Sequence, residues 1–170
     1  MESRRLMPVV IICSILALFS CSKLDTKGSY SYTLSGNVHL IDYSTVESFD
    51  ADSSEVNSSK NVRVKTENGQ LHIIDEGDGK LLLTFNCLFG DVTVLKASCV
   101  DDTITISTDN VKTVGLDMIP SVNPVLNVTG TGKIYKNRII FELQYSGVFK
   151  AGLVEYMVDE SHIDCVATRN

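Results

Sequence analysis

The sequence has little proline and few basic residues. Its 170 residues include 3 Pro and 11 Gly, and 44% are apolar, which excludes collagen-like, low-complexity and wholly disordered chains. Lys and Arg number 15 against 21 Asp and Glu, a net charge of −6, so no basic face is available for a nucleic-acid backbone. Serine nucleophile elbows, phosphate loops and clustered metal motifs are absent from the sequence. We therefore expect a non-enzymatic protein with no metal, no cofactor and no nucleic-acid partner.

The start of the chain has the pattern of a secretion signal. Residues 1–5 (MESRR) are short and basic, and the thirteen residues from 7 to 19 are almost wholly apolar. A membrane-spanning helix needs roughly 20 apolar residues, and polar sequence already begins at Ser20. We therefore expect residues 1–20 to be a signal peptide that is removed.

The residues Leu18-Phe19-Ser20-Cys21 resemble the lipobox of bacterial lipoproteins, with an aliphatic residue, a small residue and then cysteine. The resemblance implies cleavage before Cys21, a diacylglyceryl thioether on its sulfur and an acylated amino group. Two or three acyl chains would hold the protein on a membrane. Ser22 stands where Asp would resemble an inner-membrane retention signal, which favours the outer membrane, on either its periplasmic or its surface face. Residues 21–29 would then be a lipidated tether.

Apolar and polar residues alternate through the rest of the chain, which predicts half-buried β-strands and a single domain over residues 30–170. The alternation is clear at residues 30–40, 62–65, 71–74, 92–100 and 103–107. The expected turns are Asn68-Gly69, Gly77-Asp78-Gly79, Gly90-Asp91 and Asp101-Asp102. Residues 81–89 are apolar on both faces near their ends, so we expect that strand to be covered on its outer side as well.

The clearest hairpin spans residues 128–145. If Lys136-Asn137 is its turn, the residue numbers of each pair of facing residues add up to 273. The opposed pairs are then Gly130 with Leu143, Gly132 with Phe141 and Ile134 with Ile139. Bulky side chains can fold over the two glycines, which suits the strongly bent strand of a closing barrel.

About nine strands with few helical segments favour a closed up-and-down barrel or a two-sheet sandwich. The lipobox, the single meander and residues 130–134 followed by the strand at 139–145 together resemble small bacterial lipoproteins with a lipocalin-like barrel. The Gly-x-Trp of typical lipocalins is absent, since Gly36 is followed by Asn37-Val38 and the chain has no Trp. We expect an all-β antiparallel meander of about 8–10 strands forming such a barrel, with the two-sheet β-sandwich as the alternative.

The segment 109–127 is too apolar for a loop that extends freely into solvent. We expect it to pack over a barrel mouth or to plug a sandwich end, because long loops inside a compact domain are often functional. The residues that would form this ligand-mouth loop are Leu116, Met118, Ile119 and Val122.

Cysteines and histidines supply the other candidate sites. Cys165 could form a disulfide with Cys99 or Cys87, or all three could be buried thiols. His39, His72 and His162 each precede an aspartate, but alternation sends the first two and their aspartates to opposite strand faces, so we expect no shared metal site.

Two functional hypotheses follow from these patterns. A lipid-anchored barrel would bind a small apolar ligand or an envelope protein partner. A sandwich would instead be an adhesion or accessory module that acts through its outer surface. A continuous interior cavity of several hundred Å³ would favour the ligand-binding barrel, as pocket surveys suggest.

Overall fold

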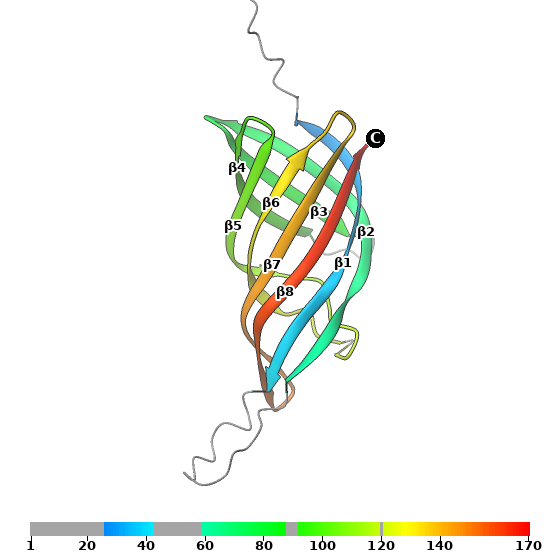
Figure 1. Ribbon diagram of the computed structural model, residues 1–170, viewed down its shortest axis with the longest axis vertical. Helices are drawn as coiled ribbons and strands as arrows, with labels where there is room; N and C mark the ends of the chain where they lie inside the picture. The colour runs from blue at the N-terminus through cyan, green and yellow to red at the C-terminus, as the bar shows by residue number, and fades with distance from the viewer. Residues whose placement is uncertain (1–25, 43–58, 88–91, 120) are drawn as a thin grey trace, which may run out of the picture.

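The computed structural model describes residues 26–42, 59–87, 92–119 and 121–170, which form one closed antiparallel β-barrel (Figure 1). The strands follow one another around the barrel in chain order, and the last closes on the first. They are β1 (Gly28–Asp42), β2 (Ser59–Gly77), β3 (Lys80–Cys87), β4 (Val92–Val100), β5 (Thr103–Lys112), β6 (Val125–Ile134), β7 (Arg138–Ala151) and β8 (Val154–Arg169). The predicted all-β meander that closes into a barrel is confirmed, and the alternative of a two-sheet sandwich is wrong. The predicted signal peptide and Cys21 lie outside the described residues.

The barrel is taller on one side than on the other. Strands β1, β2, β7 and β8 have 14 to 19 residues, whereas β3 to β6 have 8 to 10. Figure 1 shows the long strands reaching past the short ones at the end where β7 turns into β8. This difference in strand length leaves one end of the short side to be closed by a loop.

Inward side chains fill much of the barrel. Tyr32, Phe85 and Phe141 form an edge-to-face series, with ring centroids 5.0 and 6.5 Å apart. Phe141, Ile139 and Ile163 are fully buried in the same core. The apolar face that the alternation predicted is therefore the inner face of the barrel.

The hairpin of β6 and β7 has the predicted register. Gly130 pairs with Leu143, Gly132 with Phe141 and Ile134 with Ile139. A Cβ atom at Gly132 would lie 2.5 Å from Cδ1 of Phe141, so this glycine makes room for the ring. The turns at Gly77-Asp78-Gly79 and Asp101-Asp102 are also confirmed, whereas Gly90-Asp91 falls outside the described residues.

The turn predicted at Asn68-Gly69 is wrong, because β2 runs through both residues without interruption. A Cβ atom at Gly69 would lie 2.8 Å from Cε1 of Tyr32 and 2.2 Å from the backbone oxygen of Asn86. The glycine therefore serves close packing within the sheet rather than a change of direction.

The predicted cover over the outer side of β3 is not found among the described residues. Leu82 is half-buried, and its cross-strand neighbour Ile74 is 54% exposed. Within the part of the chain that the structure describes, no helix is long and apolar enough to cross a membrane.

Candidate functional site

A β-bulge in β2 turns Glu67 toward the barrel interior. Leu34 of β1 pairs with Glu67, but Gly36, two residues on, pairs with Val64, three residues back. One extra residue in β2 therefore changes which positions face inward, as a bulge does. Even-numbered residues such as Val64 are buried before the bulge, and odd-numbered residues such as Leu71 are buried after it.

The loop between β5 and β6 lies beside the first part of β2 and takes the place of a neighbouring strand there. The backbone N–H of Lys65 donates to the oxygen of Gly115 at 3.1 Å, and the N–H of Asp117 donates to the oxygen of Arg63 at 3.0 Å. Leu116 forms an isolated bridge with Val64 between these two bonds. The loop is thus fixed to β2 and closes the short side of the barrel.

The structure places the four predicted mouth residues in three different environments. Leu116 is buried at 1% exposure, whereas Met118 is 51% exposed. Ile119 and Val122 are partly buried and pack against the core. None of the four is among the described residues that line the cavity, so the loop was predicted correctly as a cover but its cavity-lining residues were not.

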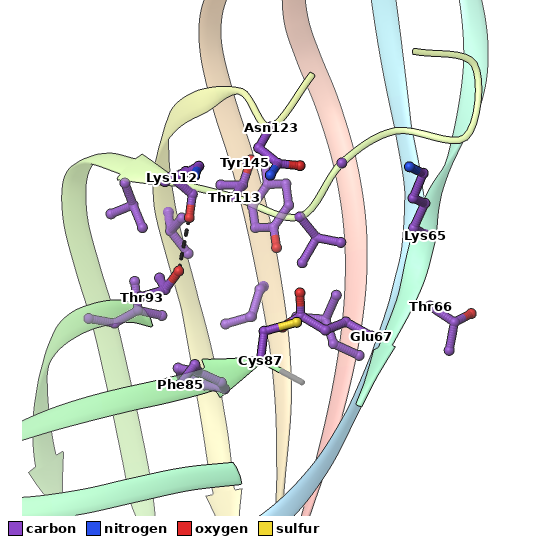
Figure 2. Close-up of a pocket in the computed structure, with 17 residues that line it drawn as sticks. Lys65, Thr66, Glu67, Phe85, Cys87, Thr93, Lys112, Thr113, Asn123 and Tyr145 are labelled. Atoms are coloured by element: carbon purple, nitrogen blue, oxygen red, sulfur yellow. Dashed lines mark hydrogen bonds between the residues drawn. The ribbon is translucent and has the colours of Figure 1, made fainter. Parts of the chain in front are cut away.

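Beneath this loop the barrel interior contains a cavity of about 350 Å³ (Figure 2). Its lining comes from strands β1 to β7 and from the loop. The lining residues are Leu34, Lys65, Thr66, Glu67, Phe85, Cys87, Thr93, Leu95, Val111, Lys112, Thr113, Val114, Gly115, Asn123, Val128, Leu143 and Tyr145. Buried side chains such as Leu40 and Val158 pack the far ends of the long strands, so the cavity lies between packed regions of the barrel.

One end of the cavity, next to the packed aromatic core, is polar. The hydroxyl of Tyr32 donates a short hydrogen bond to Oε1 of Glu67. Figure 2 shows the hydroxyl of Tyr145 and the carboxylate of Glu67 turned toward one another inside the cavity. The cavity therefore combines apolar walls with one acidic side chain and a tyrosine hydroxyl.

Burial and the charge of Glu67 keep two nearby tyrosine hydroxyls and one cysteine thiol protonated. Burial raises the pKa of Tyr145, and the charge of Glu67 raises it further. Burial and the hydrogen bond to Glu67 raise the pKa of Tyr32. Burial, followed by the charge of Glu67, raises the pKa of the Cys165 thiol to about 12. These three groups are neutral at pH 7, and Glu67 is the charge that acts on all of them.

The wall of the cavity between β4 and β5 is held by side chains. The two strands pair only over Ala97–Val100 and Thr103–Ile106. Beyond that point the hydroxyl of Thr108 accepts from the N–H of Lys96 at 2.8 Å and lies 3.3 Å from its oxygen, to which it can donate. The hydroxyl of Thr93 donates to the backbone oxygen of Lys112 at 3.0 Å, as the dashed line in Figure 2 shows. Threonine hydroxyls therefore replace the backbone ladder along this stretch.

The predicted disulfide of Cys165 with Cys99 or Cys87 is not formed, and all three residues are thiols in the structure. Cys165 lies on β8, whose neighbours are β7 and β1, whereas Cys87 and Cys99 lie on β3 and β4. A disulfide joins Cα atoms roughly 4.4 to 6.8 Å apart, and two strands that are not neighbours rarely meet that requirement.

Each histidine has a polar partner of its own. Nδ1 of His39 lies 2.6 Å from Oδ1 of Asp159, and Nδ1 of His72 lies 2.9 Å from Oγ of Ser29. His162 lies 3.6 Å from Asp164 through its Nε2. Among the described residues, no three His, Cys, Asp or Glu side chains come together as a metal site would require.

A second hollow lies on the outer face of the sheet over β1, β2 and β8 and includes Ser31, Asn68 and Thr168. Several of its polar side chains bond to one another, as Thr33 does to Asn68 at 2.7 Å. We take the interior cavity as the candidate site because it lies inside the barrel and is mainly apolar, as ligand sites commonly are.

The sequence analysis did not identify Glu67 and Tyr145 as site residues. A usable signal was present, because the apolar residues Val62 and Val64 are out of phase with Leu71 and Ile73. Such a change of phase within one strand indicates a bulge and can place a polar residue on the inner face.

The chain matches no protein-family model and no curated protein. Among solved structures, it is similar to a redesigned beta barrel, with 15% identity over 88% of this chain and 93% of that one and a TM-score of 0.46. It is also similar to EF1p2_mFAP2b bound to DFHBI, with 11% identity over 88% of this chain and 95% of that one and a TM-score of 0.46.

Proposed function

We propose that this barrel binds a small, mainly apolar ligand in its interior cavity. The observation that carries the proposal is the cavity itself, about 350 Å³ in an otherwise packed barrel. Ligand pockets commonly measure about 300 to 1,000 Å³ and are lined mainly by apolar side chains. Leu34, Leu95 and Val128 are among the side chains that provide such a lining. At about 30 Å³ for each water-sized group, the cavity holds a ligand of about a dozen non-hydrogen atoms.

The proposal places the barrel on the outer membrane through acyl chains on Cys21. The basic start, the apolar segment and the Leu18-Phe19-Ser20-Cys21 sequence support this part, which lies outside the described residues. A membrane-held binding protein suits an apolar ligand, because such ligands concentrate near lipid. The proposed role is binding, with no catalytic step.

Native mass spectrometry of the protein purified from its own envelope tests both parts. We expect a chain that begins at Cys21, carries two or three acyl groups and retains a non-covalent adduct of small mass. A chain that starts at another residue, or that lacks acyl groups, would contradict the anchor and leave the cavity hypothesis standing.

A cavity-filling substitution tests the binding site. Val128 is 2% exposed and lines the cavity, so Val128→Phe should remove the adduct. Val166→Phe is the matched control, because Val166 on β8 is 41% exposed and should tolerate the larger side chain with the adduct retained. Thermal unfolding followed by circular dichroism shows whether each variant remains folded. An adduct kept by a folded Val128→Phe protein would place the ligand elsewhere.

A further inference from the structure

We infer that the ligand is an apolar amine whose protonated nitrogen is bound by the carboxylate of Glu67, with its apolar part filling the rest of the cavity. This inference rests on the proposed function, since it assigns a ligand class to the same cavity. Three features of the site support it: the acceptors at the polar end, the sign of the charge there and the position of the two lysines.

The polar end of the cavity offers acceptors for a donor-rich ligand. An ionised carboxylate accepts several hydrogen bonds and donates none, and Tyr32 supplies one donor to Oε1 of Glu67. The hydroxyl of Tyr145, which is turned toward Glu67, can also accept a bond. An ammonium group brings three donors and no acceptor, which complements this end of the cavity.

The charge of Glu67 favours a cationic apolar ligand over an anionic or an uncharged one. Within apolar walls an ion pair is stronger than in water, so a cation gains from Glu67 and an anion is repelled. An uncharged alcohol would displace water from the carboxylate and give back a single hydrogen bond. Tyr145 and Cys165 add no charge of their own, because their raised pKa values keep both protonated. Glu67 is the one acidic side chain among the described residues that line the cavity, and one positive charge on the ligand would balance it.

The two lysines of the lining lie near the loop. Figure 2 shows Lys65 and Lys112 at the level of the loop, and Glu67 further from it, beside Cys87. Lys112 is exposed and Lys65 is half-buried, and a Cβ atom at Gly115 of the loop would lie 3.7 Å from Nζ of Lys65. A ligand amine would be repelled near the loop and attracted at Glu67, which gives the ligand a single orientation with its nitrogen innermost.

A ligand series of equal chain length tests the inference on the mature wild-type protein. Octylamine, 1-octanol and octanoate share one apolar chain and differ in charge, and all are small enough for the cavity. Isothermal titration calorimetry at pH 7 should give octylamine an affinity about tenfold higher than 1-octanol, with octanoate the weakest, since a charge-assisted hydrogen bond is roughly twice as strong as a neutral one.

Glu67→Gln provides the second test, because it keeps the shape of the side chain and removes its charge. We expect it to lower the affinity for octylamine about tenfold and to leave that for 1-octanol nearly unchanged. Glu142→Gln is the matched control, because Glu142 is exposed on β7 and should change neither affinity.

The outcomes separate this inference from the proposed function. Equal binding of octylamine and 1-octanol by the wild type, or a preference for octylamine that survives in Glu67→Gln, overturns the amine assignment and leaves ligand binding intact. If none of the three compounds binds the wild type, both proposals fail for ligands of this size. The series on the wild type decides the question even if Glu67→Gln does not fold.

Discussion

The ring of Phe141 on β7 lies against Gly132 on β6, so closely that a methyl group at Gly132 would come within 2.5 Å of a ring carbon. Phe141 is fully buried and also packs edge-to-face with Phe85 across the barrel interior. Because the ring is held on several sides, it has little room to move away from position 132. This contact links the pairing of β6 with β7 to the packing of the aromatic core.

Gly132→Ala should therefore destabilise the barrel. We expect the free energy of unfolding to fall by about 1 to 3 kcal/mol, the usual cost of adding a methyl group to a packed core. Gly152→Ala is a useful comparison, since Gly152 has φ +66 and no neighbour within 4 Å, so it should cost only the backbone strain of about 1 to 2 kcal/mol. Urea unfolding measures both, and a loss well below about 1 kcal/mol at position 132 would show that Phe141 can shift.

The β6–β7 hairpin and Gly69 show which features could be predicted from the sequence and which could not. A short turn at Lys136-Asn137 fixes the register of β6 and β7, so the pairing of Gly132 with Phe141 followed from counting residues. Gly69 carries a similar signal in sequence, but its partner Tyr32 is 37 residues away on β1, so its role as packing space was not visible locally.

The polar end of the cavity depends on contacts between residues far apart in the chain. Glu67 faces inward because of the bulge in β2, and Tyr145 reaches it from β7. Alternation alone predicts which residues face inward on a regular strand, and it does not predict where a strand gains a residue. The barrel could therefore be predicted from the alternation of apolar and polar residues and from the turn residues. The polar end of its cavity could be identified only from the tertiary structure.

Thr108→Val tests the hydroxyl that joins β4 to β5. The substitution keeps the shape of the side chain and removes the group that bonds to both the N–H and the oxygen of Lys96. We expect the free energy of unfolding to fall by about 1 to 2 kcal/mol, because each hydrogen bond contributes about 0.5 to 1.5 kcal/mol. Thr105→Val, on the exposed face of the same strand, should change it by less than about 0.5 kcal/mol. Equal effects in urea unfolding would show that the hydroxyl is not what holds the two strands.

The Cys165 thiol should resist alkylation in the folded protein. Burial and the charge of Glu67 raise its pKa from 9.0 to about 12, so very little thiolate is present at pH 8. Cys87 is half-exposed beside the cavity and should react with iodoacetamide much faster. Peptide mapping after a short exposure to the reagent measures both. Rapid labelling of Cys165, or a native mass two hydrogens lower than that of three thiols, would contradict the structure.

The same raised pKa predicts that stability falls at alkaline pH. Between about pH 9 and pH 12 the unfolded chain has lost the Cys165 proton while the folded chain still holds it. The unfolded state therefore binds fewer protons, and the free energy of unfolding decreases as pH rises through this window. Burial of Tyr145 and Tyr32 raises their pKa values and acts in the same direction. Urea unfolding at pH 8, 9.5 and 11 measures the trend, and Cys165→Ser should reduce its slope.

Leu116 and Met118 lie two residues apart in the loop that covers the cavity and allow a matched comparison. Leu116 is 1% exposed and bridges Val64, whereas Met118 is 51% exposed. We expect Leu116→Ala to lower the free energy of unfolding by about 2 to 5 kcal/mol, as for other buried leucines, and Met118→Ala to lower it by less than about 0.5 kcal/mol. Leu116→Ala should also speed hydrogen exchange at the Lys65 N–H, which bonds to Gly115, because the loop would separate from β2 more often. Unchanged exchange at Lys65 in a destabilised variant would mean that the backbone bonds alone hold the loop over the cavity.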